Sequence, residues 1–213
     1  MKRWIVFILL CVPGLAWASH GGPELCEVLG WDPVDKKVFI LRHNWSEGDA
    51  PQTLVYYDLK TNDQTKEWPC PKQVVVPWSR EWEPEDSVFT RRLTALRRRL
   101  VPPVLVENER AMYPGQVLAA DTLKDQWGGS IPRFRVEIQL PGLEDVPNVV
   151  RVTTYVTPEV TVPRVYEFPN GPSRIAVVSF RGIPWETGYE CQVPVLIETC
   201  NRTFDLEWKG FGK

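Results

Sequence analysis

The chain of 213 residues contains only two histidines, His20 and His43. His20 lies near the N-terminus, so a Ser–His or Cys–His mechanism would need His43 as its base. The sequence has no GxSxG turn to present a nucleophile to it. We therefore interpret His43, which follows Arg42 at the end of a predicted strand, as a surface or turn residue.

Motifs for metals and cofactors are also missing. The sequence has no HExxH, EF-hand, CxxC or glycine-rich phosphate motif, so we predict neither a metal site nor a cofactor. The densest carboxylate cluster is Glu81, Glu83, Glu85 and Asp86. Its position at the start of a predicted helix favours solubility and compensation of the helix dipole over catalysis.

No long apolar run follows the first 20 residues. At the N-terminus, Lys2 and Arg3 precede an apolar core of about 13 residues and the small-x-small sequence 16–18. This order predicts a secretory signal peptide cleaved between Ala18 and Ser19, since a transmembrane helix needs about 20 apolar residues. We expect a secreted or periplasmic chain without a transmembrane segment.

An excess of positive charge is lacking as well. The chain has 25 Lys and Arg against 27 Asp and Glu, and loss of Lys2 and Arg3 leaves 23 against 27. Binding to nucleic acid requires a basic surface that displaces counterions from phosphates. We therefore predict no nucleic-acid partner.

Cysteines are few but even in number after the predicted cleavage: Cys26, Cys70, Cys191 and Cys200. In an exported chain they predict two disulfides, and three connectivities are open. A Cys191–Cys200 bridge would need Cα atoms within about 7 Å, whereas an extended strand between them spans about 30 Å. Unless Pro194 bends that strand, the bridges link the two ends of the chain, which we slightly favour.

Four strand-length apolar runs fill residues 24–69, separated by clusters of turn-forming residues. They predict a four-stranded antiparallel meander, with tight turns at Asp32-Pro33 and Asn62-Asp63. The order of Trp31-Asp32-Pro33, a basic pair, a β-rich run and the sequence YYDLKT at 56–61 resembles one blade of a TolB-like or WD-type β-propeller. One further partial copy occurs in residues 168–196, whereas a propeller needs at least four blades.

Residues 71–103 are predicted to be a proline-rich connector followed by a helix. The connector contains a short edge strand at 74–76, and the prolines at 84, 102 and 103 delimit an amphipathic helix over residues 85–100. Phe89, Leu93, Leu96 and Leu100 form its apolar stripe. The remaining surface carries arginines at 91, 92, 97, 98 and 99, which suit either an anionic membrane or polymer or, as we favour, a solvated face.

The C-terminal half is predicted to be an antiparallel sheet. Strands are expected at 104–107, 133–140, 149–156 and 159–168, with a central buried strand at 174–180 and a last hairpin of 192–199 with 203–208. Residues 110–129 are expected to be a loop with a helical turn at 116–124. In 133–140, the even-numbered residues should face inward and the odd-numbered residues should face water.

These elements predict a mostly β, β-rich α+β fold: an N-terminal four-stranded meander, one helix at 85–100 and a C-terminal antiparallel sheet. The expected segments are a signal peptide (1–18), the meander (19–70), the connector and helix (71–103) and the C-terminal β region (104–213). The first and last β segments are compatible with one shared domain.

The missing motifs favour an exported, non-catalytic protein with a binding or structural role. Its expected partner is an envelope glycan or a protein, contacted by loop aromatics such as Trp78, Trp82, Trp185 and Tyr189. For Trp78 and Trp82 we favour packing against the core over exposure. The alternative function is a hydrolase of an extracellular polymer that uses two carboxylates about 5–10 Å apart.

Overall fold

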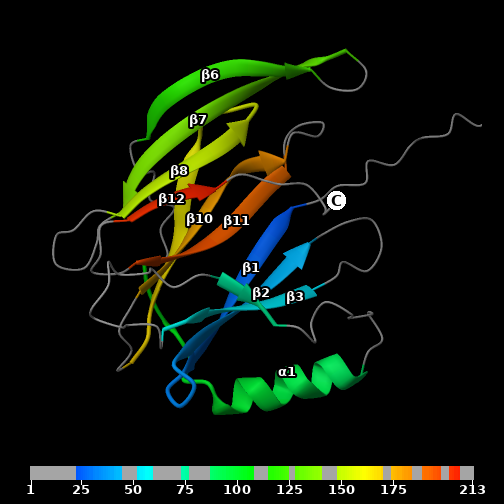
Figure 1. Ribbon diagram of the computed structural model, residues 1–213, viewed down its shortest axis with the longest axis vertical. Helices are drawn as coiled ribbons and strands as arrows, with labels where there is room; N and C mark the ends of the chain where they lie inside the picture. Colours follow the sequence, from blue (N-terminus) through cyan, green and yellow to red (C-terminus); the bar gives the residue numbers. More distant parts are fainter. Residues whose placement is uncertain are drawn as a thin grey trace, which may run out of the picture.

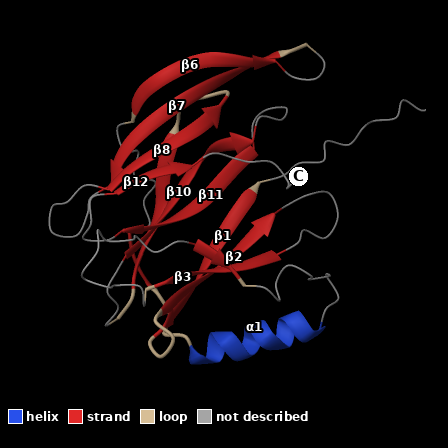
Figure 2. Ribbon diagram, in the orientation of Figure 1, coloured by secondary structure: helices blue, strands red, loops and turns tan. Residues whose placement is uncertain are grey.

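The computed structural model describes residues 23–44, 52–59, 73–76, 87–107, 115–124, 128–140, 148–169, 174–183, 189–197 and 202–206. Within these ranges the chain forms one helix and twelve strands (Figures 1 and 2). The elements are β1 (Glu24–Asp32), β2 (Lys37–Asn44), β3 (Gln52–Asp58), β4 (Gln73–Val75), α1 (Ser87–Arg99), β5 (Val104–Glu107), β6 (Gln116–Lys124), β7 (Ser130–Leu140), β8 (Asn148–Tyr155), β9 (Val160–Glu167), β10 (Arg174–Ile183), β11 (Tyr189–Ile197) and β12 (Arg202–Leu206). The mostly β fold with one helix is thereby confirmed.

The strands form two sheets. The larger sheet has the order β4-β3-β2-β1-β11-β10-β9-β5, and the smaller sheet has the order β12-β8-β7-β6. Two neighbouring pairs, β1 with β11 and β12 with β8, run parallel. The prediction of an antiparallel C-terminal sheet is therefore wrong, because β12 follows β11 of the larger sheet and pairs with β8 in the same direction rather than forming a hairpin with it.

The larger sheet folds back on itself at its centre. Only one residue pair, Glu24 with Cys191, joins β1 to β11. Beyond that junction, β1–β3 and β10–β11 face each other across a shared apolar core that includes Val38, Ile40 and Ile175. The buried hydroxyl of Tyr57 on β3 donates a hydrogen bond of 2.6 Å to the carbonyl of Pro194 on β11. The two halves of the larger sheet therefore form a β-sandwich, and they are joined at one corner, where β1 pairs with β11.

The smaller sheet covers the other face of β9–β11. Its inward side chains on β7 and β8, such as Val136, Ile138 and Val150, share a second core with Val162 and Val178. Strand β10 therefore has a core on each face, and Ile175, Ala176, Val177 and Val178 have no solvent exposure. This confirms the predicted central, fully buried strand.

Helix α1 forms the outermost layer on the opposite side (Figure 2). Its predicted apolar stripe packs on residues of β1–β3, including Leu29, Leu41 and Leu54. The layers thus follow the order α1, β1–β4, β9–β11 with β5, and the smaller sheet (Figure 1). Among the described residues, the structure contains no helix with both the length and the apolarity required to span a membrane.

The turn after β1 contacts the C-terminal end of helix α1. As predicted, Asp32 starts it, because Asp32 Oδ1 accepts hydrogen bonds from the backbone N–H of Val34 (3.0 Å) and of Asp35 (3.1 Å). The other carboxylate oxygen lies 3.0 Å from a guanidinium nitrogen of Arg99 at the helix end. Gly30 has a φ of +148°, and an added Cβ there would lie 2.6 Å from the Val101 carbonyl oxygen. Glycine is therefore required for this close approach.

Two local predictions are wrong. Residues 116–124 form strand β6 rather than a helical turn, because they pair with β7 along their length. The predicted last hairpin of 192–199 with 203–208 does not form, because β11 pairs with β10 and β1 whereas β12 pairs with β8. The fourth strand of the predicted meander, at 65–68, lies outside the described residues, and β4 takes the edge position beside β3.

Candidate functional site: a polar groove on the outer sheet

A polar site lies on the solvent face of the smaller sheet. Alternation along β7 sends Val136 and Ile138 into the core and Arg133 and Arg135 to the opposite face. The register places Glu137 of β7 opposite Arg151 of β8, and Arg151 opposite Asp205 of β12. The same side of all four strands is therefore lined by charged side chains, a regular consequence of period-two alternation.

Each of the three arginines on this face is bonded to a carboxylate. Arg133 donates from Nε to Asp121 Oδ1 at 2.7 Å and from a second nitrogen to the other oxygen, so the pair is bidentate. Arg151 Nε donates to Glu137 at 2.8 Å, and Arg135 donates to Asp205 at 3.2 Å. All three guanidinium side chains are more than a third exposed.

The bidentate pair alters the protonation of its carboxyl group. The hydrogen bond from Arg133 is the main cause that holds the pKa of Asp121 below its ordinary value of 3.8. Asp121 is therefore a carboxylate at neutral pH and is poorly suited to donate a proton as a general acid.

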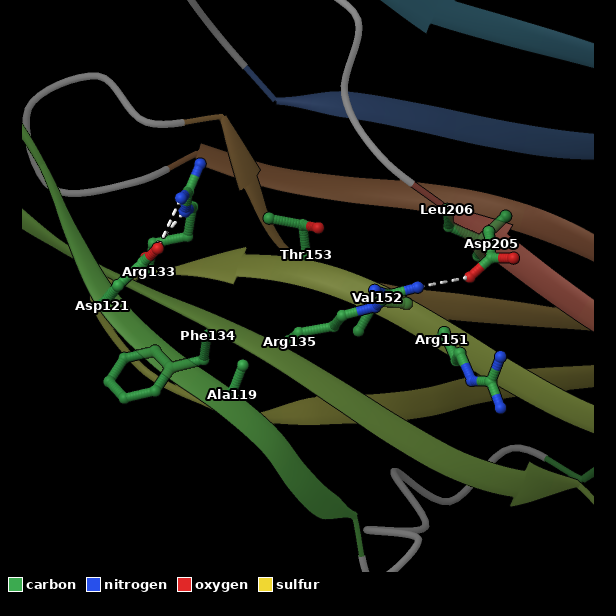
Figure 3. Close-up of a pocket in the computed structure, with 10 residues that line it drawn as sticks. All are labelled: Ala119, Asp121, Arg133, Phe134, Arg135, Arg151, Val152, Thr153, Asp205 and Leu206. Atoms are coloured by element: carbon green, nitrogen blue, oxygen red, sulfur yellow. Dashed lines mark hydrogen bonds and ion pairs between the residues drawn. The ribbon is translucent and has the colours of Figure 1, made fainter.

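Arg133, Arg135, Arg151, Asp121 and Asp205 line a depression of about 300 Å³ that we call the outer-face groove. Figure 3 shows the Arg133–Asp121 pair at its left end, the Arg135–Asp205 pair near its centre and Arg151 at its right. Its lining comes from all four strands of the smaller sheet: Ala119, Asp121, Arg133, Phe134, Arg135, Arg151, Val152, Thr153, Asp205 and Leu206. The groove is open and combines five charged side chains with apolar lining residues, and it does not enclose a ligand as a deep apolar pocket does.

The carboxylates of the groove do not form an acid–base pair. Asp121 and Asp205 lie on opposite edge strands of the four-stranded sheet, which places their strands about 14 Å apart. Glu137 and Asp205 lie in one row about 10 Å apart, with Arg151 on the strand between them. Both are already bonded to arginines, whereas carboxylate-based hydrolysis needs one carboxyl group to carry a proton.

A second polar cluster lies inside the sandwich near the β1–β11 junction. Arg164 on β9 donates to the Gln192 side-chain oxygen (2.6 Å) and to the Cys26 carbonyl (3.2 Å). Glu190 accepts bonds from Ser179 (2.6 Å) and from the Gln192 amide (3.1 Å). The cluster connects four strands by mutually satisfied hydrogen bonds, which gives it a structural role at the joined corner.

The predicted disulfide cysteines are only partly described. Cys26 and Cys191 are both buried, and each faces a different core. A direct Cys26–Cys191 bridge is therefore not formed. Burial is the main cause that raises the pKa of both thiols from 9.0 to about 12, which makes them poor nucleophiles. Cys70 and Cys200 lie outside the described residues, so bridges that involve them stay a prediction.

The predicted aromatic contacts are likewise mostly outside the described part of the chain. This applies to Trp78, Trp82 and Trp185, and also to the expected cleavage site at Ala18 and Ser19. Tyr189 begins β11 and is partly buried against the core beneath the smaller sheet. His43 is half-buried, with Nε2 3.8 Å from a carboxylate oxygen of Glu27.

Sequence reasoning identified part of the groove. The alternation of residues 133–140 placed Arg133 and Arg135 on the water-facing side, but Asp121, Arg151 and Asp205 were not singled out. The sequence pattern predicts a helical turn around Asp121 and a hairpin of residues 192–199 with the strand that carries Asp205. The alternation of Thr203, Phe204, Asp205 and Leu206 was the available signal that Asp205 points to solvent.

Within the described residues, no group of three or more His, Cys, Asp or Glu side chains is placed to hold a metal ion. No protein-family model, curated protein or solved structure matches this chain.

Proposed function

We propose that this chain acts outside the cytoplasm as a non-catalytic protein with a binding or structural role. The observation that carries the proposal is the outer-face groove, where three partly exposed arginines lie with their carboxylate partners on one face of the smaller sheet. Charged groups held on strands are well positioned for recognition. The signal-peptide pattern that ends at Ala18 supports an extracytoplasmic location.

The alternative is a carboxylate-based hydrolase. It draws on the row that contains Glu137 and Asp205, whose spacing of about 10 Å is near the upper limit for an inverting pair. Two observations weigh against it: each of these carboxylates is bonded to an arginine, and the lowered pKa of Asp121 makes that residue a poor acid. We therefore favour binding over hydrolysis.

Both parts of the proposal are tested on the full-length chain produced in a bacterial host. Intact mass spectrometry of the extracytoplasmic fraction should give the mass of Ser19–Lys213. A chain that retains Met1 in the cytoplasm would contradict export. The purified mature protein is then incubated with cell-envelope polysaccharides while reducing-end release is monitored. We expect no release, and release that is abolished by Glu137→Gln or Asp205→Asn would establish the hydrolase instead.

A further inference from the structure

The backbone positions of the three groove arginines follow a diagonal line across β7 and β8. Arg133 and Arg135 lie two residues apart on β7, which separates them by about 7 Å along the strand. Arg151 lies on the next strand opposite Glu137, two residues beyond Arg135, and so about 8 Å from Arg135. These intervals separate the backbone positions, and the side chains reach Asp121 on β6, Asp205 on β12 and Glu137 on β7. Three guanidinium groups on one face offer a ligand with repeated carboxylates more contacts than a single ion can use.

The protein's own side chains indicate which anion these arginines accept. Asp121, Glu137 and Asp205 each present a carboxylate to one guanidinium, and the Arg133–Asp121 contact is bidentate. Planar guanidinium groups recognise carboxylates in this fork geometry. A ligand carboxylate can therefore take the place of a protein carboxylate without reorientation of the arginine.

At two of the three arginines, replacement of the protein carboxylate by a ligand carboxylate should cost little free energy. Asp121 and Asp205, the partners of Arg133 and Arg135, lie on the edge strands and have side chains that are 54% and 62% exposed. Exposed ion pairs contribute little to stability because water solvates the separated charges almost as well. Once displaced, the two aspartates and the hydroxyl of Thr153 are left to accept hydrogen bonds from hydroxyl groups of the ligand.

The groove favours a glycan over a protein partner. Protein–protein interfaces have apolar centres with few charges. The exposed large apolar residues of the described chain are Val34, Val74, Val88, Val104, Leu105, Val106, Val117 and Leu118, and none of them lines the groove. Ala119, Phe134, Val152 and Leu206 also line the groove, beside its charged side chains. The guanidinium, carboxylate and hydroxyl groups of the groove match the carboxylates and hydroxyls of an acidic sugar polymer.

We propose that the outer-face groove binds an acidic polysaccharide through carboxylate groups held by Arg133, Arg135 and Arg151. This inference rests on the proposed binding function and specifies its ligand class. Arg135 supplies a central contact by exchange of Asp205, and Arg151 keeps its Nε bond to Glu137 and contributes its other guanidinium N–H groups. Arg133 supplies the contact at the end of the groove.

Isothermal titration calorimetry with hexagalacturonate, which carries a carboxylate on each sugar, tests the proposal. We expect saturable binding that weakens as salt is raised and is absent with the methyl-esterified hexamer, which retains the hydroxyls but lacks the charges. Arg135→Ala and Arg151→Ala should each weaken binding about tenfold or more, and the Lys variants should restore only part of it, because lysine lacks the planar fork.

The matched control is Arg174→Ala. Arg174 is also exposed and paired with a carboxylate, that of Glu167, but it lies on β10 outside the groove. It should leave the affinity unchanged. Equal affinity for the esterified hexamer, equal loss in the Arg174 variant, or no binding of hexagalacturonate would overturn the inference. Export and the absence of reducing-end release are measured separately, so the proposed function can survive that outcome.

Discussion

The two faces of the smaller sheet consist of the same strands but have opposite chemistry. On β7 and β8, Ile138 and Val150 are 1% and 0% exposed in an apolar core, whereas Arg135 and Arg151 line the outer-face groove. Neighbouring residues differ in this way because successive side chains on a strand point to opposite faces. The comparison separates two roles: the inner face stabilises the fold, and the outer face is available for binding without a large cost in stability.

Substitutions on the inner face of the smaller sheet should lower the free energy of unfolding more than substitutions on its outer face. Ile138→Ala removes buried methylene and methyl groups and leaves a cavity under the sheet, which should lower the free energy of unfolding by about 2–5 kcal/mol. The adjacent Gln139, which is exposed, provides the control, because Gln139→Ala should change it by less than about 0.5 kcal/mol. Urea unfolding measures both. Similar losses in the two variants would show that the faces are not distinct.

Alkaline pH should reveal the state of the two buried thiols. Burial raises the pKa of Cys26 and Cys191 from 9.0 to about 12. Above pH 9 the unfolded chain loses thiol protons that the folded chain retains, so stability is complete below pH 9 and falls as pH rises toward 12. By pH 10 the expected loss is about 1.4 kcal/mol for each free thiol.

The measurement is urea unfolding at pH 8 and pH 10 under reducing conditions. A variant with Cys26→Ala and Cys191→Ala corrects for the tyrosines and lysines that also titrate in this range, and it should lose less stability between the two pH values. If non-reduced protein shows no thiol-dependent loss, then these cysteines are disulfide-bonded, as predicted for an exported chain.

Removal of an outer-face arginine should affect stability far less than loss of core packing. Arg151→Ala breaks the 2.8 Å contact with Glu137, but the arginine side chain is 37% exposed. We expect a change in unfolding free energy of less than about 1 kcal/mol. Thermal unfolding of the same preparation used for titration is the appropriate measurement, and a loss as large as that of Ile138→Ala would assign Arg151 a structural role instead.

The smallest effect concerns a single carboxyl group. Arg133→Ala should return the pKa of Asp121 upward toward 3.8, because the hydrogen bond that lowers it is lost. In the unsubstituted protein, the contribution of this pair is present above pH 3.8 and is lost as pH falls through the lowered pKa. Carboxyl-carbon NMR titration of Asp121 reports the shift, and an unchanged titration would exclude Arg133 as its cause.

The polar groups of the groove and those near the β1–β11 junction also differ in how easily water can replace a lost hydrogen-bond partner. Arg164 bonds Gln192 and the Cys26 carbonyl near the β1–β11 junction, where these groups are partly buried and loss of one partner leaves the others with less access to water. The groove arginines have water as a replacement partner. Binding sites built from such exposed pairs can exchange partners, whereas the interior cluster holds β1, β9, β10 and β11 at one corner.

The sequence alone was sufficient for features that depend on short-range pattern. The alternation of residues 133–140 determined which side chains of β7 are buried, the apolar run at 174–180 determined the central strand, and the stripe from Phe89 to Leu100 determined the buried face of α1. The Asp32 turn was also predictable, because its side chain bonds backbone groups only two and three residues away.

Tertiary structure decided the features that depend on long-range pairing. Parallel pairing of β12 with β8 brings Asp205 beside Arg151, although 53 residues lie between them in the chain. Strand β6 was missed because its side chains are almost all exposed, so it lacks the alternation that marks a half-buried strand. Alternation shows which face a residue occupies, but the neighbour of a strand follows from the packing of the whole chain, and this packing assembled the groove.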